Sequence, residues 1–199
     1  MPSDATNRSP DTFAVRVATT TDVAALNVLI AASARELSVG FYSPAQIDAA
    51  IEYVFGVDSQ LIADGTYFVI DGDSGPEAAG GWSARRTLFG GDQAKDAVGP
   101  HLDPRADAAR IRAFFVHPAF ARRGLARRLY VECERAARAA GFQKLELMGT
   151  LPGEPLYLAL GFAVVERVVL LLGGVDVPFT RMMRSIASSD VTEVHPPSA

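Results

Sequence analysis

Arginine side chains gather around a single glycine in the second half of the sequence, and they are its clearest candidates for chemistry. The cluster consists of Arg122, Arg123, Arg127 and Arg128, with no acidic residue among them, in a chain whose formal net charge is −4. A local positive patch on an acidic protein favours a small anionic ligand. A nucleic acid would call for a wider basic surface, and the pI of about 5.4 is against one. We therefore predict an anion site and no nucleic-acid partner.

The elements on either side of this cluster must position it. The apolar run that ends at His117-Pro118 is typical of a strand stopped by proline, and Leu125 and Leu129 share one face of a following helix. The first turn of such a helix has unpaired amide N–H groups and a partial charge of about +0.5, which attract phosphate oxygens. Gly124 lacks the Cβ that would keep a phosphate away from these amides. The alternative is a solvated, arginine-rich helix start without a ligand.

Hydrophobic periodicity predicts strands and helices on both sides of this loop. Strands are expected at 13–17, 66–71, 77–84, 114–116, 144–148, 163–172 and 175–183. Helices are expected after Thr20-Thr21-Asp22, at the capping box Ser43–Gln46 and from Leu125, with a short helical turn from Tyr157. The strand, helix and strand around the arginines imply a parallel pair, whose ligands lie beyond the carboxyl ends of the strands. Gly80-Gly81 indicates a bulge or a close approach to the backbone.

A long segment from Arg85 to Asp107 has no periodic pattern. A loop of this length in a compact domain is usually functional or mobile, and this one could close over an acceptor site. Its acids would favour a cationic substrate; they are Asp92, Asp96, Asp103 and Asp107. A solvated loop without such a role is the alternative.

The composition describes one globular domain. Of the 199 residues, 49% are hydrophobic and 21% are charged. We expect the domain to span 13–186, between flexible tails at 1–12 and 187–199. Apolar runs such as Val168–Leu172 are far too short to cross a bilayer, so we expect no membrane partner and a cytoplasmic location.

Cysteine and histidine content argues against disulfide and metal chemistry. Cys133 is the single cysteine, so no intrachain disulfide or cysteine metal cluster is possible. Its place within the predicted helix favours a small core residue over a nucleophile. The histidines have no metal-ligand spacing, and we predict no metal site.

Two motifs resemble those of one enzyme superfamily. The run Val116-His117-Pro118 followed by Ala121–Ala126 resembles the acetyl-CoA pyrophosphate loop of the GCN5-related N-acetyltransferases (GNAT). That loop has Gln or Arg, two residues, Gly, one residue, then Gly or Ala; here Ala121 departs from the first position and Ala126 fits the last. Further on, Tyr157 lies four residues before Gly161-Phe162, as in the second GNAT signature.

The resemblance implies an α/β (α+β) GNAT-like single domain, with a mixed central sheet of about six to seven strands and about four flanking helices. It also implies acetyl transfer from acetyl-CoA, as co-substrate, to an amine. The strand end 114–116 would supply amides for the oxyanion and for the pantetheine arm. The implied cofactor-binding residues are Phe114, Phe115, Val116, Arg122, Arg123, Gly124, Leu125, Ala126, Arg127 and Thr150, the last standing where the family commonly has Asn.

Proton transfer has one implied donor and several candidate acceptors. The resemblance places Tyr157 beside the CoA sulfur. With pKa values of about 10 for a phenol and about 8.5 for a thiol, full protonation of the thiolate is uphill by about 2 kcal/mol, which favours a hydrogen-bond role. Glu146 is the first candidate for the base, followed by His101 and His117, and an amine of low pKa would need none.

Two functions of different classes remain open. The first is an N-acetyltransferase acting on a small-molecule amine or an exposed protein amino group. The second is a non-catalytic acyl-CoA-binding sensor or regulatory domain that keeps the arginine loop. A dinucleotide-binding oxidoreductase is excluded because no G-x-G-x-x-G follows an early strand. The final hairpin, 163–183, offers an edge for a possible homodimer.

Overall fold

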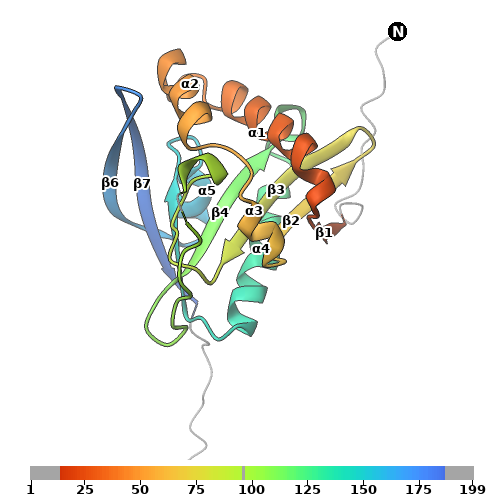
Figure 1. Cartoon of the computed structure of the whole chain (residues 1–199), viewed down its shortest axis with the longest axis vertical. Coiled ribbons are helices and arrows are strands. Elements are labelled where there is room, and N and C mark those ends of the chain that lie inside the picture. The colour runs from red at the N-terminus through yellow and green to blue at the C-terminus, as the bar shows by residue number, and fades with distance from the viewer. Residues whose placement is uncertain (1–13, 96, 187–199) are drawn as a thin grey trace, which may run out of the picture.

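The computed structural model describes residues 14–95 and 97–186, so the predicted tails and Phe13 lie outside the described residues. Within this part, seven strands form one mixed sheet in the order β1-β2-β3-β4-β5-β7-β6 (Figure 1). The strands are β1 (Val15–Val17), β2 (Tyr67–Gly72), β3 (Gly75–Ser83), β4 (Ala109–Val116), β5 (Lys144–Gly149), β6 (Ala163–Leu172) and β7 (Val175–Ser185). The predicted fold class is confirmed.

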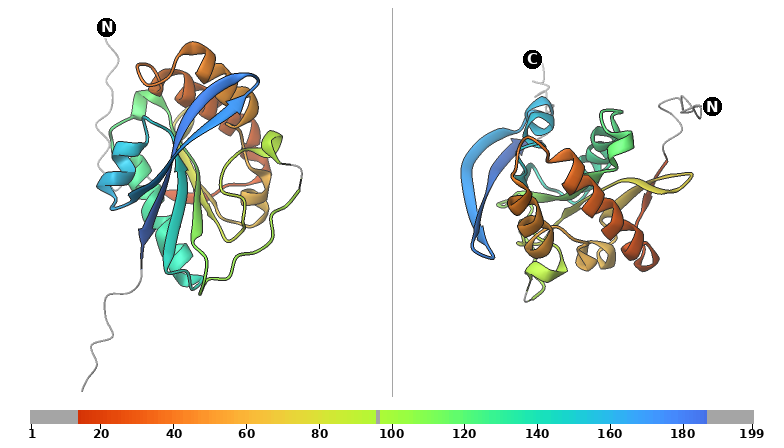
Figure 2. Two further views of the ribbon diagram at one scale, coloured as in Figure 1. Left: turned by 90° about the vertical axis from the view of Figure 1, so that its left-hand side faces the viewer. Right: turned by 90° about the horizontal axis from the view of Figure 1, so that it is seen from above.

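Helices cover both faces of the sheet (Figure 2). They are α1 (Val23–Leu37), α2 (Pro44–Tyr53), α3 (Ser59–Ala63), α4 (Leu125–Ala139) and α5 (Glu154–Ala159). The first pair, α1 and α2, packs on one face, and α4 and α5 pack on the other. The sequence predicts about four helices and does not reveal α3. This helix has only 5 residues after its N-cap Asp58, too few for hydrophobic periodicity to show.

The sheet splits between its two parallel strands. β4 and β5 pair only at Ala109 with Leu145 and at Arg110 with Glu146. Beyond these positions β4 diverges, whereas β5 stays paired with β7 over its whole length. The split therefore opens at the carboxyl end of β4, the edge at which open α/β sheets bind ligands.

A β-bulge in β4 sets which side chains face each side of the split. Gly81 pairs with Arg112 and the next pairing is Ala79 with Phe115, so two residues of β4 oppose Gly80 alone. The bulged Ala113 has φ 55°, and a Cβ on Gly80 would lie 2.8 Å from the Phe114 ring. The sequence left a bulge or a close approach open at Gly80-Gly81, and both occur.

The bulge shifts the alternation of side chains by one residue. Ile111 and Phe114 both pack with core residues on the α4 face, although three residues apart in a strand they would normally face opposite ways. Phe115 packs on the α1 face instead. The two aromatic side chains of β4 thus line opposite sides of one strand.

Cys133 lies fully buried in α4, as expected for a core residue, and burial raises the pKa of its thiol well above the usual value. Among the described residues, no group of three or more His, Cys, Asp or Glu side chains is placed to hold a metal ion. None of the helices in the described part of the chain is long and apolar enough to cross a membrane. The cytoplasmic location stays a prediction.

Candidate active site

A cavity of about 620 Å³ lies at the split, between the carboxyl half of β4, the start of α4 and the start of α5. It brings together most of the residues that the sequence singled out: Phe114, Phe115, Val116, Arg122, Gly124, Leu125, Ala126, Arg127, Thr150 and Tyr157. Two predicted residues, Arg123 and Glu146, are not part of its lining. A cavity of this size is typical of a small-molecule site.

Main-chain groups of β4 point into the split. The His117 N–H donates to the Glu77 carbonyl at 2.8 Å, and hydrogen-bonded pairs alternate along an antiparallel ladder. Phe115 therefore directs its N–H and C=O toward β3. Because peptide groups are planar, the Phe114 carbonyl and both main-chain groups of Val116 face the opposite way, toward the split. The amide of Phe115 is thus committed to the sheet, and the Val116 amide is the one available at the cavity.

Ser33 of α1 holds this amide from the other side of the cavity. Its hydroxyl oxygen accepts the Val116 N–H at 3.3 Å, a long and therefore weak hydrogen bond. Ser33 is itself buried and lines the cavity. A ligand oxygen could replace this hydroxyl at little cost. The sequence gave no signal for Ser33, because it is an ordinary polar residue within a helix.

The start of α4 is built to accept an anion. Gly124 is the N-cap and has φ 84°, a conformation that glycine adopts without strain, and it offers no side chain to cap the helix. The first turn holds no acidic residue. Arg122 also lies in the left-handed region, with φ 64°, which costs about 1–2 kcal/mol for a residue with a Cβ. Such strain gathers at ligand-binding sites.

Three of the four clustered arginines divide into different roles. Arg122 and Arg127 line the cavity and have no ion-pair partner among the described residues. Arg123 instead lies over the Phe120 ring, with 5.2 Å between its guanidinium carbon and the ring centroid. We expect Arg122 and Arg127 to contact a bound anion directly. Arg123 would contribute its positive charge from a distance and its packing against Phe120.

Tyr157 projects from α5 into the buried side of the cavity. Its ring lies edge-on to Phe114 and Phe162, at centroid distances of 6.5 and 5.8 Å. Its hydroxyl has no hydrogen-bond partner among the described residues. Burial is the main cause that raises the pKa of Tyr157 above its usual 10. The phenol is therefore neutral and able to donate a hydrogen bond at physiological pH.

Thr150 lies in the turn between β5 and α5. Its Oγ1 accepts the Gly153 N–H at 3.3 Å, which closes the turn that leads into α5. Tyr42 fixes the same turn from outside: its hydroxyl accepts the Leu151 N–H at 2.9 Å and donates to the Pro178 carbonyl at 2.7 Å. Sequence reasoning missed Tyr42, which lies more than 100 positions from its partners.

Glu146 occupies a different environment from the one that a general base needs. It is 3% exposed, lies outside the cavity lining and forms ion pairs with Arg110 and Arg181. Two guanidinium partners hold the carboxylate in place and direct it away from the cavity lining. The other two base candidates, His117 and His101, are also outside the lining. His117 caps the turn after β4 through Nδ1, which accepts the Ala119 N–H at 3.2 Å. The backbone of His101 forms an isolated antiparallel β-bridge with that of Arg85.

The long loop of 85–107 contributes to the cavity through four residues, Leu88–Gly91. Its described acids do not line the cavity. Asp92 accepts the Ser59 N–H at 3.0 Å, and Asp103 and Asp107 cap a turn of the loop. The loop therefore closes over the cavity, as the sequence suggested it could, but with apolar side chains. The signal was the pair Leu88-Phe89 within an otherwise polar segment.

The chain is similar to known acetyltransferases in both sequence pattern and fold. The acetyltransferase (GNAT) family matches residues 33–162, well over half of the chain. The chain belongs to this family. No curated protein matches the chain significantly.

Solved structures at low sequence identity show the same fold. A GCN5-related N-acetyltransferase from Rhodopseudomonas palustris is 20% identical, with 87% of this chain and 96% of that one covered and a TM-score of 0.64. The PaiA N-acetyltransferase from Thermoplasma acidophilum, solved with coenzyme A, is 15% identical, with 87% and 99% covered and a TM-score of 0.58. YncA from Salmonella typhimurium, solved with its cofactor acetyl-CoA, is 15% identical, with 92% and 99% covered and a TM-score of 0.58.

Proposed function

We propose that this acetyltransferase moves the acetyl group of acetyl-CoA to a primary amine, carried by a small molecule or by an exposed protein amino group. The observation that supports this most is the meeting of three features in one cavity: a helix start without a side-chain cap, main-chain groups of β4 that are not paired within the sheet, and the unpartnered hydroxyl of Tyr157. Each of these suits a different part of acetyl-CoA.

Binding follows from the geometry of the split. The pyrophosphate would bind the amides of Gly124–Arg127 and the side chains of Arg122 and Arg127. The pantetheine arm would extend β4 as a strand-like partner, using the carbonyls of Phe114 and Val116, which leaves the Val116 N–H for the thioester oxygen. Thr150 holds the turn on the opposite side of the split. Its hydroxyl is shorter than the Asn amide that is common in the family, so we expect it to contribute mainly by closing this turn.

The reaction forms a C–N bond and breaks the C–S bond of the thioester. As the amine nitrogen attacks, the carbonyl oxygen becomes an oxyanion, and the Val116 N–H is placed to stabilise it in exchange for Ser33. The electron pair of the C–S bond leaves on sulfur, where Tyr157 would donate a hydrogen bond. Because burial raises the pKa of Tyr157, complete proton transfer to the thiolate is uphill by more than about 2 kcal/mol. Tyr157 therefore stabilises the thiolate, and water delivers its proton after it departs.

The amine must lose a proton, and the described cavity lining contains no carboxylate or imidazole to take it. We propose that the acceptor reacts from its neutral form and transfers its proton to water. The pH profile of kcat/KM should then rise with the pKa of the amine itself. Comparing two amines of different pKa tests this. Under the proposal the rise in kcat/KM shifts in pH with the pKa of the amine, whereas an enzymic base would make kcat/KM rise at the same pH for both amines.

A calorimetric titration with acetyl-CoA, followed by thiol release with a panel of amines, tests the proposed function. Tight binding with amine-dependent release supports the enzyme. Tight binding without release for any amine or protein amino group would favour the acyl-CoA sensor. Tyr157 favours the enzyme, since a sensor has no need of a hydrogen-bond donor within the cavity.

We also propose that the chain forms a homodimer through β6. This edge strand is unpaired on one side, and its apolar side chains are largely exposed: Val164, Val165, Val169 and Leu171. Such an edge is a template for pairing with another strand. Light scattering over a range of concentrations should show a dimer, and Val169→Lys should shift it to a monomer. A wild-type monomer at every concentration would contradict the proposal.

A further inference from the structure

The cavity has a second part that the acetyl-CoA contacts do not use. We call it the acceptor wall: it is formed by Phe41, Val54, Phe55, Leu88, Phe89 and Phe179. These residues come from segments far apart in the sequence and meet on the α1 side of the split. Every member is apolar, and most are aromatic.

Aromatic contacts hold the centre of the acceptor wall. Phe55 lies edge-on to Phe115 of β4 at 5.6 Å and to Phe179 of β7 at 6.3 Å between ring centroids. The bulge in β4 is what turns Phe115 to this side. Phe55 therefore bridges from β4 to β7 across the cavity, whose lining also includes Val116.

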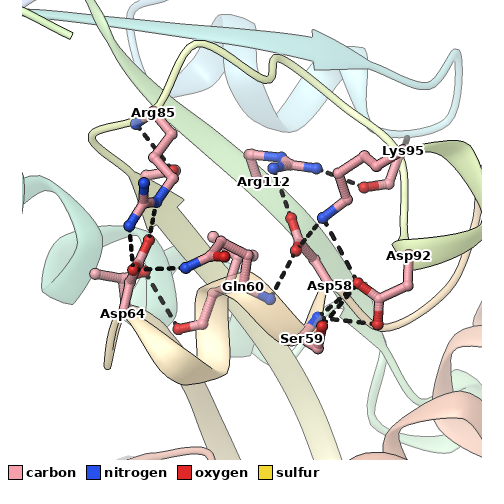
Figure 3. A network of polar contacts seen from close by, with 12 residues as sticks. Asp58, Ser59, Gln60, Asp64, Arg85, Asp92, Lys95 and Arg112 are labelled. Atoms are coloured by element: carbon pink, nitrogen blue, oxygen red, sulfur yellow. Dashed lines mark hydrogen bonds and ion pairs between the residues drawn. The ribbon is translucent and has the colours of Figure 1, made fainter. Parts of the chain in front are cut away.

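A buried ion network fixes the outer part of the acceptor wall (Figure 3). Arg112 pairs with Asp58 at 2.6 Å and donates to the Gly90 carbonyl, and Lys95 pairs with the same carboxylate. The Gly91 N–H donates to the Val54 carbonyl at 2.8 Å. Leu88 and Phe89 are thereby anchored rather than carried on a free loop.

Two glycines allow this close approach. A Cβ on Gly91 would lie 2.8 Å from the carbonyl carbon of Gly56, a contact that side chains do not tolerate. The backbone of the loop is therefore pressed against the segment that carries Phe55. The acceptor wall is a preformed surface, and a preformed surface selects its ligand without an ordering cost.

The charge of the cavity lining has one sign only. Among its described residues the charged side chains are Arg112, Arg122 and Arg127, and no carboxylate is present. Asp58 compensates Arg112 from outside the lining and is itself fully buried and doubly paired. A second ammonium group on an acceptor would meet apolar rings and guanidinium groups without a counter-ion, which is costly.

From these observations we infer that the acceptor is a monoamine whose amino group is carried on an apolar, aromatic-sized framework, and not a polyamine or a cation-rich substrate. This inference rests on the proposed N-acetyltransferase function and names its substrate class. Three of the loop acids, which from the sequence could have favoured a cationic substrate, are used in turns and helix caps instead: Asp92, Asp103 and Asp107, whereas Asp96 lies outside the described residues. The ring of the acceptor would pack against Phe55 and Phe89 while its amine reaches the Val116 amide.

The test compares three amines with the protein saturated with CoA, so that binding is measured without turnover. The probes are 2-phenylethylamine, ethylamine and 1,4-diaminobutane, and the readout is calorimetry. Burial of the phenyl group should make 2-phenylethylamine bind at least about 30-fold more tightly than ethylamine. The diamine should bind no more tightly than ethylamine. Initial rates with acetyl-CoA should follow the same order.

A matched pair of variants tests the acceptor wall itself. Leu88→Glu puts a carboxylate into the half-buried wall, and Val28→Glu puts one on the exposed face of α1, outside the cavity and away from β6. Leu88→Glu should lower the affinity for 2-phenylethylamine and raise that for 1,4-diaminobutane, by about tenfold each. Val28→Glu should change neither. Acetyl-CoA affinity should be the same in both variants as in the wild type.

The outcomes separate this inference from the proposed function. Binding of 1,4-diaminobutane that is tighter than that of ethylamine, or binding of 2-phenylethylamine that is no tighter than that of ethylamine, overturns the inference even where acetyl-CoA binds and is turned over. A preference for long-chain acyl-CoA over acetyl-CoA also overturns it, because the apolar wall would then hold the acyl chain. Failure of the protein to bind acetyl-CoA or CoA at all overturns the proposed function first.

Discussion

Replacing Tyr157 by phenylalanine removes one oxygen atom from the proposed chemistry. The ring contacts with Phe114 and Phe162 do not involve the hydroxyl, and they persist in the variant. The hydroxyl has no partner within the described residues, so no donor or acceptor is left unpaired. We expect the free energy of unfolding to change by less than about 0.5 kcal/mol. The affinity for acetyl-CoA should also be unchanged.

Turnover should fall because the lost hydrogen bond strengthens only as the thiolate forms. A hydrogen bond to a charged group contributes about 1.5–3 kcal/mol. At 1.36 kcal/mol for each factor of ten, kcat should fall about 10- to 150-fold, with the KM for acetyl-CoA within about twofold. The raised pKa adds a second expectation. Since the phenol stays protonated below about pH 10, both proteins should have the same pH profile up to that value.

Tyr130→Phe is the matched control. Tyr130 is also a buried tyrosine that stacks edge-on to Phe162, but its hydroxyl is hydrogen-bonded to Arg184 and Glu134. This variant should lose about 1–2 kcal/mol of stability, a drop of about 2–8 °C in Tm, and keep its kcat. Thiol-release kinetics and thermal unfolding measure both variants. Full turnover in Tyr157→Phe would remove Tyr157 from the mechanism, and an equal kcat loss in Tyr130→Phe would show that the effect is packing.

Three further substitutions separate binding, structure and positioning. Gly124→Val forces a β-branched residue to a φ of 84° at the helix start, and calorimetry should show a Kd for acetyl-CoA at least tenfold higher. The control is Gly65→Val, with φ 69° in a turn outside the cavity lining, which should lower stability alone. Glu146→Gln leaves Arg110 and Arg181 without their carboxylate and should lower stability by about 3 kcal/mol, or about 6–12 °C in Tm. The pH profile of kcat/KM should keep its wild-type shape, and loss of its fall at acidic pH would instead show that Glu146 is a base. Tyr42→Phe unpairs the Leu151 N–H and the Pro178 carbonyl and should cost about 1–3 kcal/mol in a denaturant titration, with a weaker acetyl-CoA interaction from the loosened turn; unchanged stability would mean that water replaces the hydroxyl.

The fold, and the meeting of the two motifs at one cavity, could be predicted because their signals are local. Alternation and capping residues show strands and helices, and the segments from Val116 to Ala126 and from Tyr157 to Phe162 carry a motif within a few residues. The acceptor wall could not be predicted, since Phe55, Phe89 and Phe179 meet only through the tertiary fold. The ion pairs of Glu146 are hidden from the sequence for the same reason: its two arginine partners are 36 and 35 positions away in the chain, and only the fold brings them together.

The charged side chains of β4 lie before the bulge, and the main-chain groups that face the cavity lie after it. Arg110 and Arg112, two residues apart, point to one face before the bulge, and each is paired with a buried carboxylate on a neighbouring element. The pair of Arg110 and Glu146 ties β4 to β5 where the split begins. Arg112 ties β4 to the long loop, because it also donates to the Gly90 carbonyl. Past the bulge, β4 offers only apolar side chains and main-chain groups to the cavity. In the proposed reaction the oxyanion would therefore be stabilised by the fixed Val116 amide beside apolar side chains, where a hydrogen bond is stronger than in water.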